Sequence, residues 1–279
     1  MAHALVTTPL CPLMSQPTHQ CERADEVLCG WGLDILDRPC PGWVQVRTDY
    51  GYTGFAPTDC LLEDPCRAAQ WEGLPKVMVT GGLCDLLNRP EVEGWRVDTI
   101  PRGALAALVG PPLEAGWQRL ALPDGREGYT KSSFLSNNYE KAPFWGEEVL
   151  RASIVRRAQS YLGVQYRWGG KSPVGIDCSG LTFMSYFLHG ITIFRDARIE
   201  PGFPVRAIPF EQARPADLLY FPGHIALYLG EGRYIHSTAR AGSDGVVVNS
   251  LTPGAPDYRA DLRESLITAG TVFPRNSGE

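Results

Sequence analysis

The sequence predicts a multidomain chain in which two small all-β barrels precede a domain of α+β structure. Three observations predict this order: a repeat within the first half of the chain, short strand-like runs in both copies, and a change to helical periodicity near residue 146. A length of 279 residues sets a prior of about two domains. We expect the barrels at residues 1–66 and 75–136 and the third domain at residues 145–279.

The repeat lies in matching motifs of the two barrels. "VTTPLCPL" at residues 6–13 recurs as "VTGGLCDL" at 79–86, and "GYTGF" at 51–55 recurs as "GREGY" at 125–129. Runs such as "WVQVRT", bounded by turn residues, are typical of short strands. The copies differ where Tyr52 corresponds to Arg126. We expect a first linker at Pro65 and "EGLPK", and a second at "SNNYEKAPFWGEE".

The third segment begins with helical spacing over residues 146–163, and Gly163 is a natural stop. The apolar spacing of "LTFMSYFL" predicts a second helix that begins between Asp177 and Ser179 and ends at Gly190. "ADLLYF", "HIALYLG" and "RYIHST" then predict three consecutive strands, the last two joined by a turn at "GEG".

Cys178 falls in the first turn of the predicted second helix, after the glycine-rich stretch "GGKSPVGID". A helix N-terminus stabilises an anion, so we expect a lowered thiol pKa and a nucleophilic sulfur. The glycines would let the backbone turn sharply and leave room for a substrate. A buried structural cysteine beside an aspartate cap is the alternative that this stretch leaves open.

A nucleophilic thiol requires a base, and two histidines fit. A hairpin centred on Glu231 places His236 opposite Ala226, two residues from His224 on the same face of the sheet. Zinc held by Cys178 and this pair is an alternative, but no second cysteine or acidic ligand is evident, so we expect no metal and no other cofactor. We expect the other histidines at the surface, with His189 a solvated cation at a helix end.

Bulk properties exclude several partners. A net charge of -5 and a pI of about 5.6 provide no basic surface for nucleic acid or an anionic membrane. No run reaches the roughly 18 apolar residues of a membrane span, and "MAHALVTTPL" is no basic leader with a long apolar core. We therefore expect a cytoplasmic protein. Seven of the eight cysteines precede residue 85 without a CxxC pair, which favours reduced thiols.

The motifs "YRWGGKSPVGIDCSGL", "RPADLLYF" and "HIALYLGEGRYIHS" resemble the catalytic domain of the NlpC-type cell-wall peptidases, a papain-like cysteine peptidase family. The resemblance covers residues 146–275. The tryptophan and Gly-x-x-Gly-aromatic pattern of the repeats resembles the bacterial SH3-like domain. Two such domains before the peptidase resemble the γ-D-glutamyl-L-diamino acid endopeptidases, which recycle peptidoglycan stem peptides. The implied fold is two all-β SH3-like barrels followed by an α+β papain-like domain.

The resemblance implies roles for catalytic residues. Cys178 corresponds to the nucleophile, His224 to the general base and His236 to the group that orients the base. Tyr166 corresponds to a tyrosine near the oxyanion, where its hydroxyl would assist the backbone N–H of Cys178.

The resemblance also implies a binding site for a tri- or tetrapeptide with a free N-terminal L-Ala. Tyr52 corresponds to a tyrosine in the wall that the first SH3-like domain provides, and Asp177 to the acid that pairs with the ammonium. Ser179 and Arg195 correspond to positions that hold the α-carboxylate of D-Glu. Glu22 is a second candidate acid for the amine. Relatives often carry serine where this chain has Ala197.

The expected reaction is hydrolysis of the bond between γ-D-Glu and the diamino acid, which is either meso-diaminopimelate or L-Lys. Three alternatives stay open. These are an amidase or acyltransferase of related fold, a secreted hydrolase that cuts intact cell wall, and a scaffold whose third domain is inert. The second barrel, with Arg126 in place of tyrosine, is expected to be structural.

Overall fold

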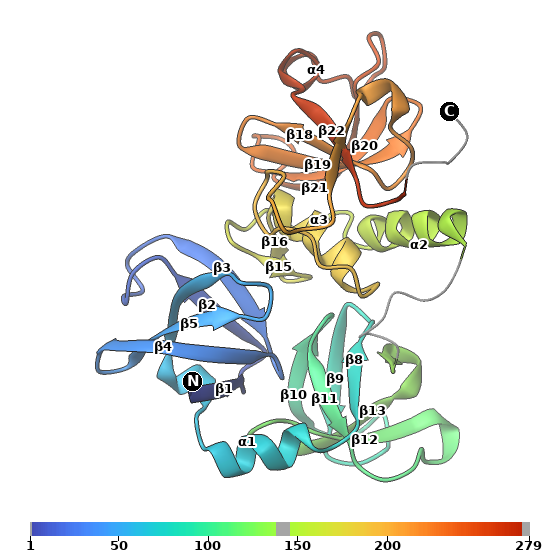
Figure 1. Ribbon diagram of the computed structural model, residues 1–279. Helices are drawn as coiled ribbons and strands as arrows, with labels where there is room; N and C mark the ends of the chain where they lie inside the picture. The colour runs from blue at the N-terminus through green and yellow to red at the C-terminus, as the bar shows by residue number, and fades with distance from the viewer. Residues whose placement is uncertain (1, 138–145, 275–279) are drawn as a thin grey trace. The chain divides into compact units, whose positions relative to one another are not determined.

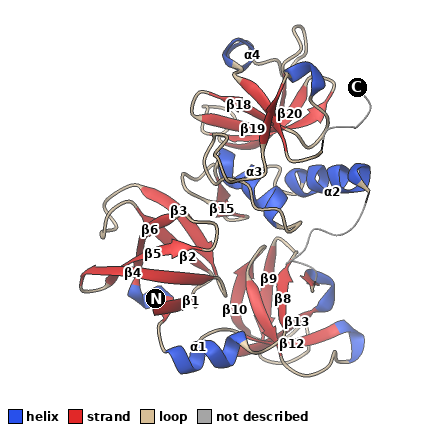
Figure 2. Cartoon of the chain, viewed as in Figure 1, coloured by secondary structure: helices blue, strands red, loops and turns tan. Residues whose placement is uncertain are grey.

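The computed structural model describes residues 2–137 and 146–274. The chain divides into two compact units, residues 1–139 and 140–279. Both are rich in strands, and helices are few (Figures 1 and 2). The expected second linker covers residues 136–148, and its residues 138–145 lie outside the described residues.

The first half of unit 1 is a seven-stranded antiparallel sheet, which we call the first β-repeat. Its strands follow the order β3-β2-β6-β5-β4-β1-β7. Every second side chain of β5 is buried, as a half-buried strand requires. The strands are β1 (Ala2–Val6), β2 (Leu10–Met14), β3 (Arg23–Leu28), β4 (Gly32–Cys40), β5 (Trp43–Thr48), β6 (Thr53–Pro57) and β7 (Leu61–Leu62).

The second half of unit 1, the second β-repeat, is another seven-stranded sheet. Its order, β10-β9-β13-β12-β11-β8-β14, is that of the first with seven added to each strand number. The repeat in the sequence is therefore a duplicated structure. The strands are β8 (Lys76–Val79), β9 (Leu83–Leu87), β10 (Arg96–Pro101), β11 (Leu105–Leu108), β12 (Trp117–Ala121), β13 (Glu127–Lys131) and β14 (Leu135–Ser136).

The first linker contains a helix that the sequence analysis did not predict, α1 (Pro65–Glu72). Asp64 caps it by accepting the N–H groups of Cys66 and Arg67, and Pro65 occupies the first turn, where a missing N–H costs nothing. Trp71 donates from its indole to the Ala121 carbonyl at 3.0 Å. This helix therefore packs between the two repeats within unit 1.

Unit 2 combines a six-stranded antiparallel sheet, of order β17-β22-β18-β19-β20-β21, with helices. The predicted strands at 224–230 and 233–238 are confirmed as β19 (His224–Gly230) and β20 (Arg233–Thr238). The predicted helices are α2 (Glu147–Gln159) and α3 (Cys178–Phe187). The remaining elements are β15 (Lys171–Ser172), β16 (Gly175–Ile176), β17 (Arg206–Ile208), β18 (Leu218–Phe221), β21 (Gly245–Ser250), α4 (Ala260–Ser265) and β22 (Thr268–Thr271).

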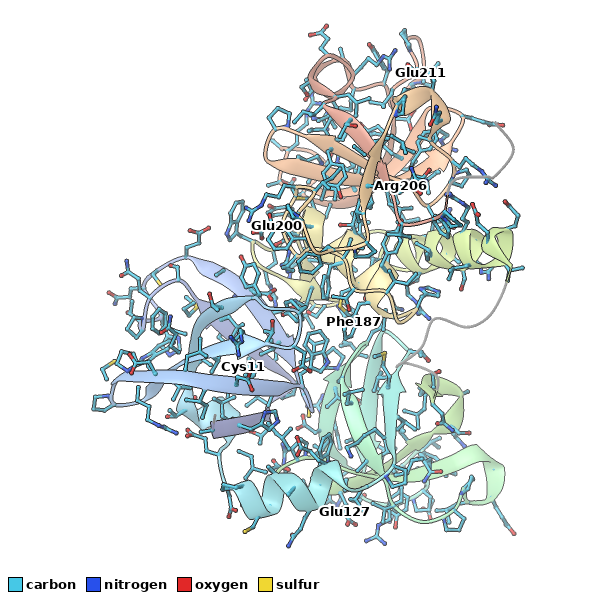
Figure 3. The ribbon with its side chains drawn as sticks, viewed as in Figure 1. Cys11, Glu127, Phe187, Glu200, Arg206 and Glu211 are labelled. Carbon is cyan, nitrogen blue, oxygen red and sulfur yellow. The ribbon has the colours of Figure 1, made fainter. Side chains whose placement is uncertain are left out.

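Helix α3 is the central element of unit 2. All its residues from Cys178 to Tyr186 are buried, and Phe183 stacks on Phe187, the residue labelled in Figure 3, with ring centroids 5.4 Å apart. The expectation that His189 is a solvated cation is wrong. Its side chain is buried between α2 and α3, bonded to Ser153 Oγ at 2.8 Å, and burial lowers its pKa below the usual value.

None of the helices within the described ranges 2–137 and 146–274 is long and apolar enough to cross a membrane. All eight cysteines are free thiols.

Candidate active site

The glycine-rich stretch before Cys178 forms the short hairpin of β15 and β16, which packs against the first turn of α3. A Cβ atom on Gly180 would lie less than 3.0 Å from the Gly170 carbonyl oxygen, so the two backbones meet only because residue 180 has no side chain. The same carbonyl accepts the N–H of Asp177 at 3.1 Å. The glycines therefore serve backbone packing behind the thiol, in addition to any room for substrate.

Asp177 is the N-cap of α3, and its Oδ1 atom accepts the N–H of Gly180 at 2.5 Å. Cys178 follows as the first helical residue, as the sequence predicted, and is 7% exposed. The first turn of a helix leaves its N–H groups without helical partners, so they are directed at groups such as this thiol.

The expected lowering of the Cys178 pKa is wrong. Burial, and next the negative charge of Asp177, raises the pKa of this thiol to about 11. Three weaker influences oppose the rise, namely hydrogen bonds from the backbone of Ile225 and Ser179 and the positive charge of Arg195. The thiol is therefore protonated at neutral pH, and a nearby base must remove its proton during any attack.

The two predicted histidines meet through their ring nitrogens. His224 Nε2 lies 2.7 Å from His236 Nδ1. The strand register agrees with a hairpin centred on Glu231, since Leu227 pairs with Ile235, each four residues from that centre. His236 is fully buried, and its Nε2 lies 2.8 Å from Asn249 Oδ1.

Both imidazoles are neutral at physiological pH. Burial, followed by the charge of the neighbouring His236, lowers the pKa of His224 to about 3. Burial lowers the pKa of His236 to about 4, although its hydrogen bond to Asn249 opposes this. A neutral imidazole carries one N–H and one lone pair, so each ring can donate one hydrogen bond and accept another.

The thiol lies beside β19, the strand that carries His224. Ile225, the residue after His224, supplies the backbone hydrogen bond to Cys178. Tyr166 bridges to Ile176, two residues before the thiol. Burial raises the Tyr166 pKa, and the charges of Cys178 and Asp177 raise it further, which places this phenol close to both.

Asp177, Ser179 and Arg195 form one buried network, although the sequence analysis assigned them to different groups of a substrate. Arg195 is 2% exposed and donates to both carboxylate oxygens of Asp177, at 3.1 and 3.0 Å. It also donates to Ser179 Oγ at 2.7 Å. Ser179 in turn donates to Asp177 Oδ1 at 3.2 Å. Arg195 is thus the countercharge of Asp177.

Tyr52 and Glu22 belong to unit 1, where they lie on neighbouring segments of the first β-repeat. Tyr52 is half-buried, and its hydroxyl donates to the Ala24 carbonyl at 3.3 Å. Glu22 is exposed, two residues before that carbonyl.

The sequence analysis missed Asn249, the partner of His236. A signal was available, because this amide interrupts the apolar strand "GVVVNS". Among residues 2–137 and 146–274, no group of three or more histidine, cysteine or acidic side chains is arranged to hold a metal ion.

A thiol at a helix N-terminus, beside a strand hairpin that carries a hydrogen-bonded histidine pair, defines a site of the cysteine peptidase class. The chain belongs to the NlpC/P60 family of cysteine peptidases. The NlpC/P60 family profile matches residues 163–259. The chain is 36% identical over 273 residues to dipeptidyl-peptidase 6 of Lysinibacillus sphaericus, an alignment that spans 97% of this chain and 100% of the relative.

Two further proteins resemble the chain along most of its length. The γ-D-glutamyl-L-lysine dipeptidyl-peptidase of Bacillus cereus is 27% identical over 261 residues, which cover 86% of this chain and 74% of that protein. The crystal structure of an NlpC/P60 family protein from Bacillus cereus covers 98% of this chain and 100% of its own, with a TM-score of 0.79 and 22% identity. At that identity it supports the fold alone.

Proposed function

We propose that the protein is a cysteine endopeptidase that hydrolyses the bond between γ-D-Glu and the diamino acid in peptidoglycan stem peptides. The substrate carries a free N-terminal L-Ala, and the product is L-Ala-γ-D-Glu. The observation that supports this most is the 36% identity to dipeptidyl-peptidase 6 across 97% of this chain and all of the relative, both β-repeats included. In this proposal the repeats are SH3-like domains and unit 2 is a papain-like domain.

The first half of the proposed reaction is acyl transfer to Cys178. His224 accepts the thiol proton as the sulfur attacks the γ-carbonyl carbon of D-Glu, and a C–S bond forms while the carbonyl π electrons move to oxygen. Collapse of the tetrahedral intermediate breaks the C–N bond. His224 returns its proton to the departing amine, which leaves as the free diamino acid.

The second half hydrolyses the thioester. His224 removes a proton from water, the oxygen attacks the acyl carbon, and the C–S bond breaks. The proton then returns to the Cys178 sulfur, which restores the thiol. We assign the oxyanion of both tetrahedral intermediates to the backbone N–H of Cys178 and the hydroxyl of Tyr166. Two donors of this kind stabilise the developing charge.

The family resemblance assigns the substrate-binding residues in this proposal. Asp177 receives the ammonium of L-Ala, while Ser179 and Arg195 attract the α-carboxylate of D-Glu. Tyr52 and Glu22 of the first SH3-like domain are further candidates for recognition of the amine. Because Arg195 already pairs with Asp177, the carboxylate offers the ammonium less net charge than a lone aspartate would. The site then favours a ligand that carries both an ammonium and a carboxylate, since each meets one half of the pair.

A substrate of this kind arises when peptidoglycan fragments are taken apart, so we place the protein in cytoplasmic recycling of wall peptides. The test compares L-Ala-γ-D-Glu-meso-diaminopimelate, its L-Lys counterpart, and the same peptides acetylated on the L-Ala nitrogen. Products are read by mass spectrometry for the wild type and for Cys178→Ala.

We expect the wild type to release L-Ala-γ-D-Glu from the free-amine peptides only. The Cys178→Ala variant should release none. Equal cleavage of acetylated peptides would retain the peptidase and overturn the amine recognition. Cleavage of intact peptidoglycan in preference to free peptides would favour a secreted wall hydrolase. Activity on amides or lipid esters without peptide cleavage would favour an amidase or acyltransferase. Peptide binding without cleavage, unchanged in Cys178→Ala, would favour the scaffold.

A further inference from the structure

Asn249 is the only amide side chain in the apolar run of strand β21, and its two polar atoms have different partners. Its Nδ2 atom lies 3.1 Å from the backbone carbonyl oxygen of Asp257. A carbonyl oxygen can only accept a hydrogen bond, so the NH₂ group of the amide must face it. The Oδ1 atom of Asn249 is therefore directed to His236 Nε2, 2.8 Å away.

The backbone holds this carbonyl in place. Asp257 O also accepts the N–H of Ser250 at 3.0 Å, and Arg259 donates its N–H to the Ser250 carbonyl at 2.9 Å. The loop after β21 is thus tied to Ser250, the last residue of the strand, at both Asp257 and Arg259. The orientation of the Asn249 amide follows from these main-chain bonds rather than from any titratable group.

The orientation of the Asn249 amide determines which nitrogen of each histidine carries the proton. Its oxygen can only accept, so the Nε2 atom of a neutral His236 must carry the proton, and His236 Nδ1 is then a lone pair. That lone pair faces His224 Nε2 at 2.7 Å, so His224 Nε2 must in turn carry a proton. The remaining nitrogen of His224, Nδ1, is left as the only lone pair of that ring.

We propose that Asn249 is a positioning residue that fixes the tautomers of both histidines and so leaves His224 Nδ1 unprotonated as the base for Cys178. The inference rests on the catalytic roles proposed above. His236 orients the His224 ring but cannot by itself choose its tautomer, because an imidazole with either nitrogen protonated can bond to its neighbour. The amide of Asn249 removes this choice.

The reverse arrangement shows why the choice matters. If Nδ1 of His236 carried the proton, His224 Nε2 would have to accept a hydrogen bond from it. The single proton of a neutral His224 would then lie on its Nδ1. The base would then present an N–H where a lone pair is required. His236 is fully buried, so its tautomer is set by Asn249 and His224 rather than by exchange with bulk water.

The direct test is the ¹⁵N NMR spectrum of histidine-labelled protein, in which protonated and unprotonated ring nitrogens have distinct shifts. The wild type should show protons on Nε2 of both His224 and His236. A proton on Nδ1 of either ring would overturn the proposal without any variant. This readout needs no substrate, so it stands even if the proposed peptide is not cleaved, in which case the proposed function fails alone.

Two variants separate positioning from packing. Asn249→Leu keeps the size of the side chain but removes the acceptor, so the two tautomers should become mixed and kcat should fall by ~10²-fold with KM little changed. Asn249→Gln retains both an acceptor oxygen for His236 Nε2 and an NH₂ group for the Asp257 carbonyl, so it should keep the wild-type tautomers and recover part of kcat.

Val248→Ala is the matched control, one residue earlier on β21, and should leave the imidazole shifts and kcat unchanged. Wild-type tautomers together with wild-type kcat in Asn249→Leu would overturn the proposal. So would an Asn249→Gln variant that keeps the wild-type tautomers but is as inactive as Asn249→Leu while folded, as judged by its thermal unfolding.

Discussion

Arg195 and Asp177 form a bidentate ion pair immediately before the candidate nucleophile, with N–O distances of 3.1 and 3.0 Å and both side chains almost entirely buried. The pair joins the segment between α3 and β17 to the N-terminus of α3. A buried carboxylate and guanidinium are stable only together, because either charge alone is costly to desolvate. The geometry of the first turn of α3 therefore depends on a residue far from it in sequence.

Replacement of Arg195 alone should lower the free energy of unfolding more than replacement of both Arg195 and Asp177. Arg195→Met leaves Asp177 buried without its countercharge, so the free energy of unfolding should fall by ~3–5 kcal/mol. The double variant Arg195→Met with Asp177→Asn should regain part of that loss. Urea unfolding of the wild type, both single variants and the double variant measures this cycle, and strictly additive losses would contradict the coupling.

The close approach of Gly180 to the Gly170 carbonyl predicts that position 180 does not tolerate any side chain. Gly180→Ala should lower the free energy of unfolding by ~1–3 kcal/mol and reduce kcat, because its methyl group pushes α3 away from the Gly170 carbonyl. Gly82→Ala is a matched control, since a Cβ there meets nothing within 4 Å. Thermal unfolding and peptide cleavage are measured for both. Equal effects of the two substitutions would argue against backbone packing as the reason for Gly180.

The neutral thiol and imidazoles predict an activity profile that stays level in acid. A base is competent above its pKa, and the pKa of His224 is lowered to about 3, so protonation inactivates it only at strongly acidic pH. We expect kcat/KM to be level between about pH 5 and pH 8. The measurement is initial-rate kinetics in constant-ionic-strength buffers. An acid limb near the ordinary histidine pKa of 6.5 would mean that a charged imidazole forms in the resting enzyme.

Tyr52 should affect discrimination between substrates more than chemistry. In the proposed function, Tyr52→Ala raises KM for the free-amine peptide and narrows the ratio of kcat/KM between free and acetylated peptides, with kcat little changed. Tyr52→Phe tests whether the hydroxyl, which bonds to Ala24, or the ring is responsible. A Tyr52→Ala variant that retains the full ratio would remove this residue from amine recognition.

Local patterns predicted much of the fold. The repeat motifs predicted a duplicated sheet. The spacing around Glu231 predicted the register that brings His224 to His236, because hairpin pairing depends on a few adjacent residues. Helix α1 was missed because the proline at its start reads equally as a linker signal.

The sequence predictions that were wrong or incomplete concern the tertiary surroundings of single side chains rather than secondary structure. The pKa of Cys178 depends on burial and on Asp177, and the burial of His189 depends on how α2 meets α3. Asn249 acquires its role only through the carbonyl of Asp257, eight residues further along the chain. No periodicity in a single sequence reports such tertiary contacts.

The shared strand order of the two repeats makes Tyr52 and Arg126 equivalent positions, each directly before the sixth strand of its sheet. Arg126 is held there by Asp98 at 2.8 Å and Asp124 at 2.6 Å. One scaffold thus carries an aromatic ring at this turn in its first copy and a surface ionic cluster at the same turn in its second. The strand framework therefore tolerates two different chemistries at one turn, because neither side chain is needed to set the order of the strands.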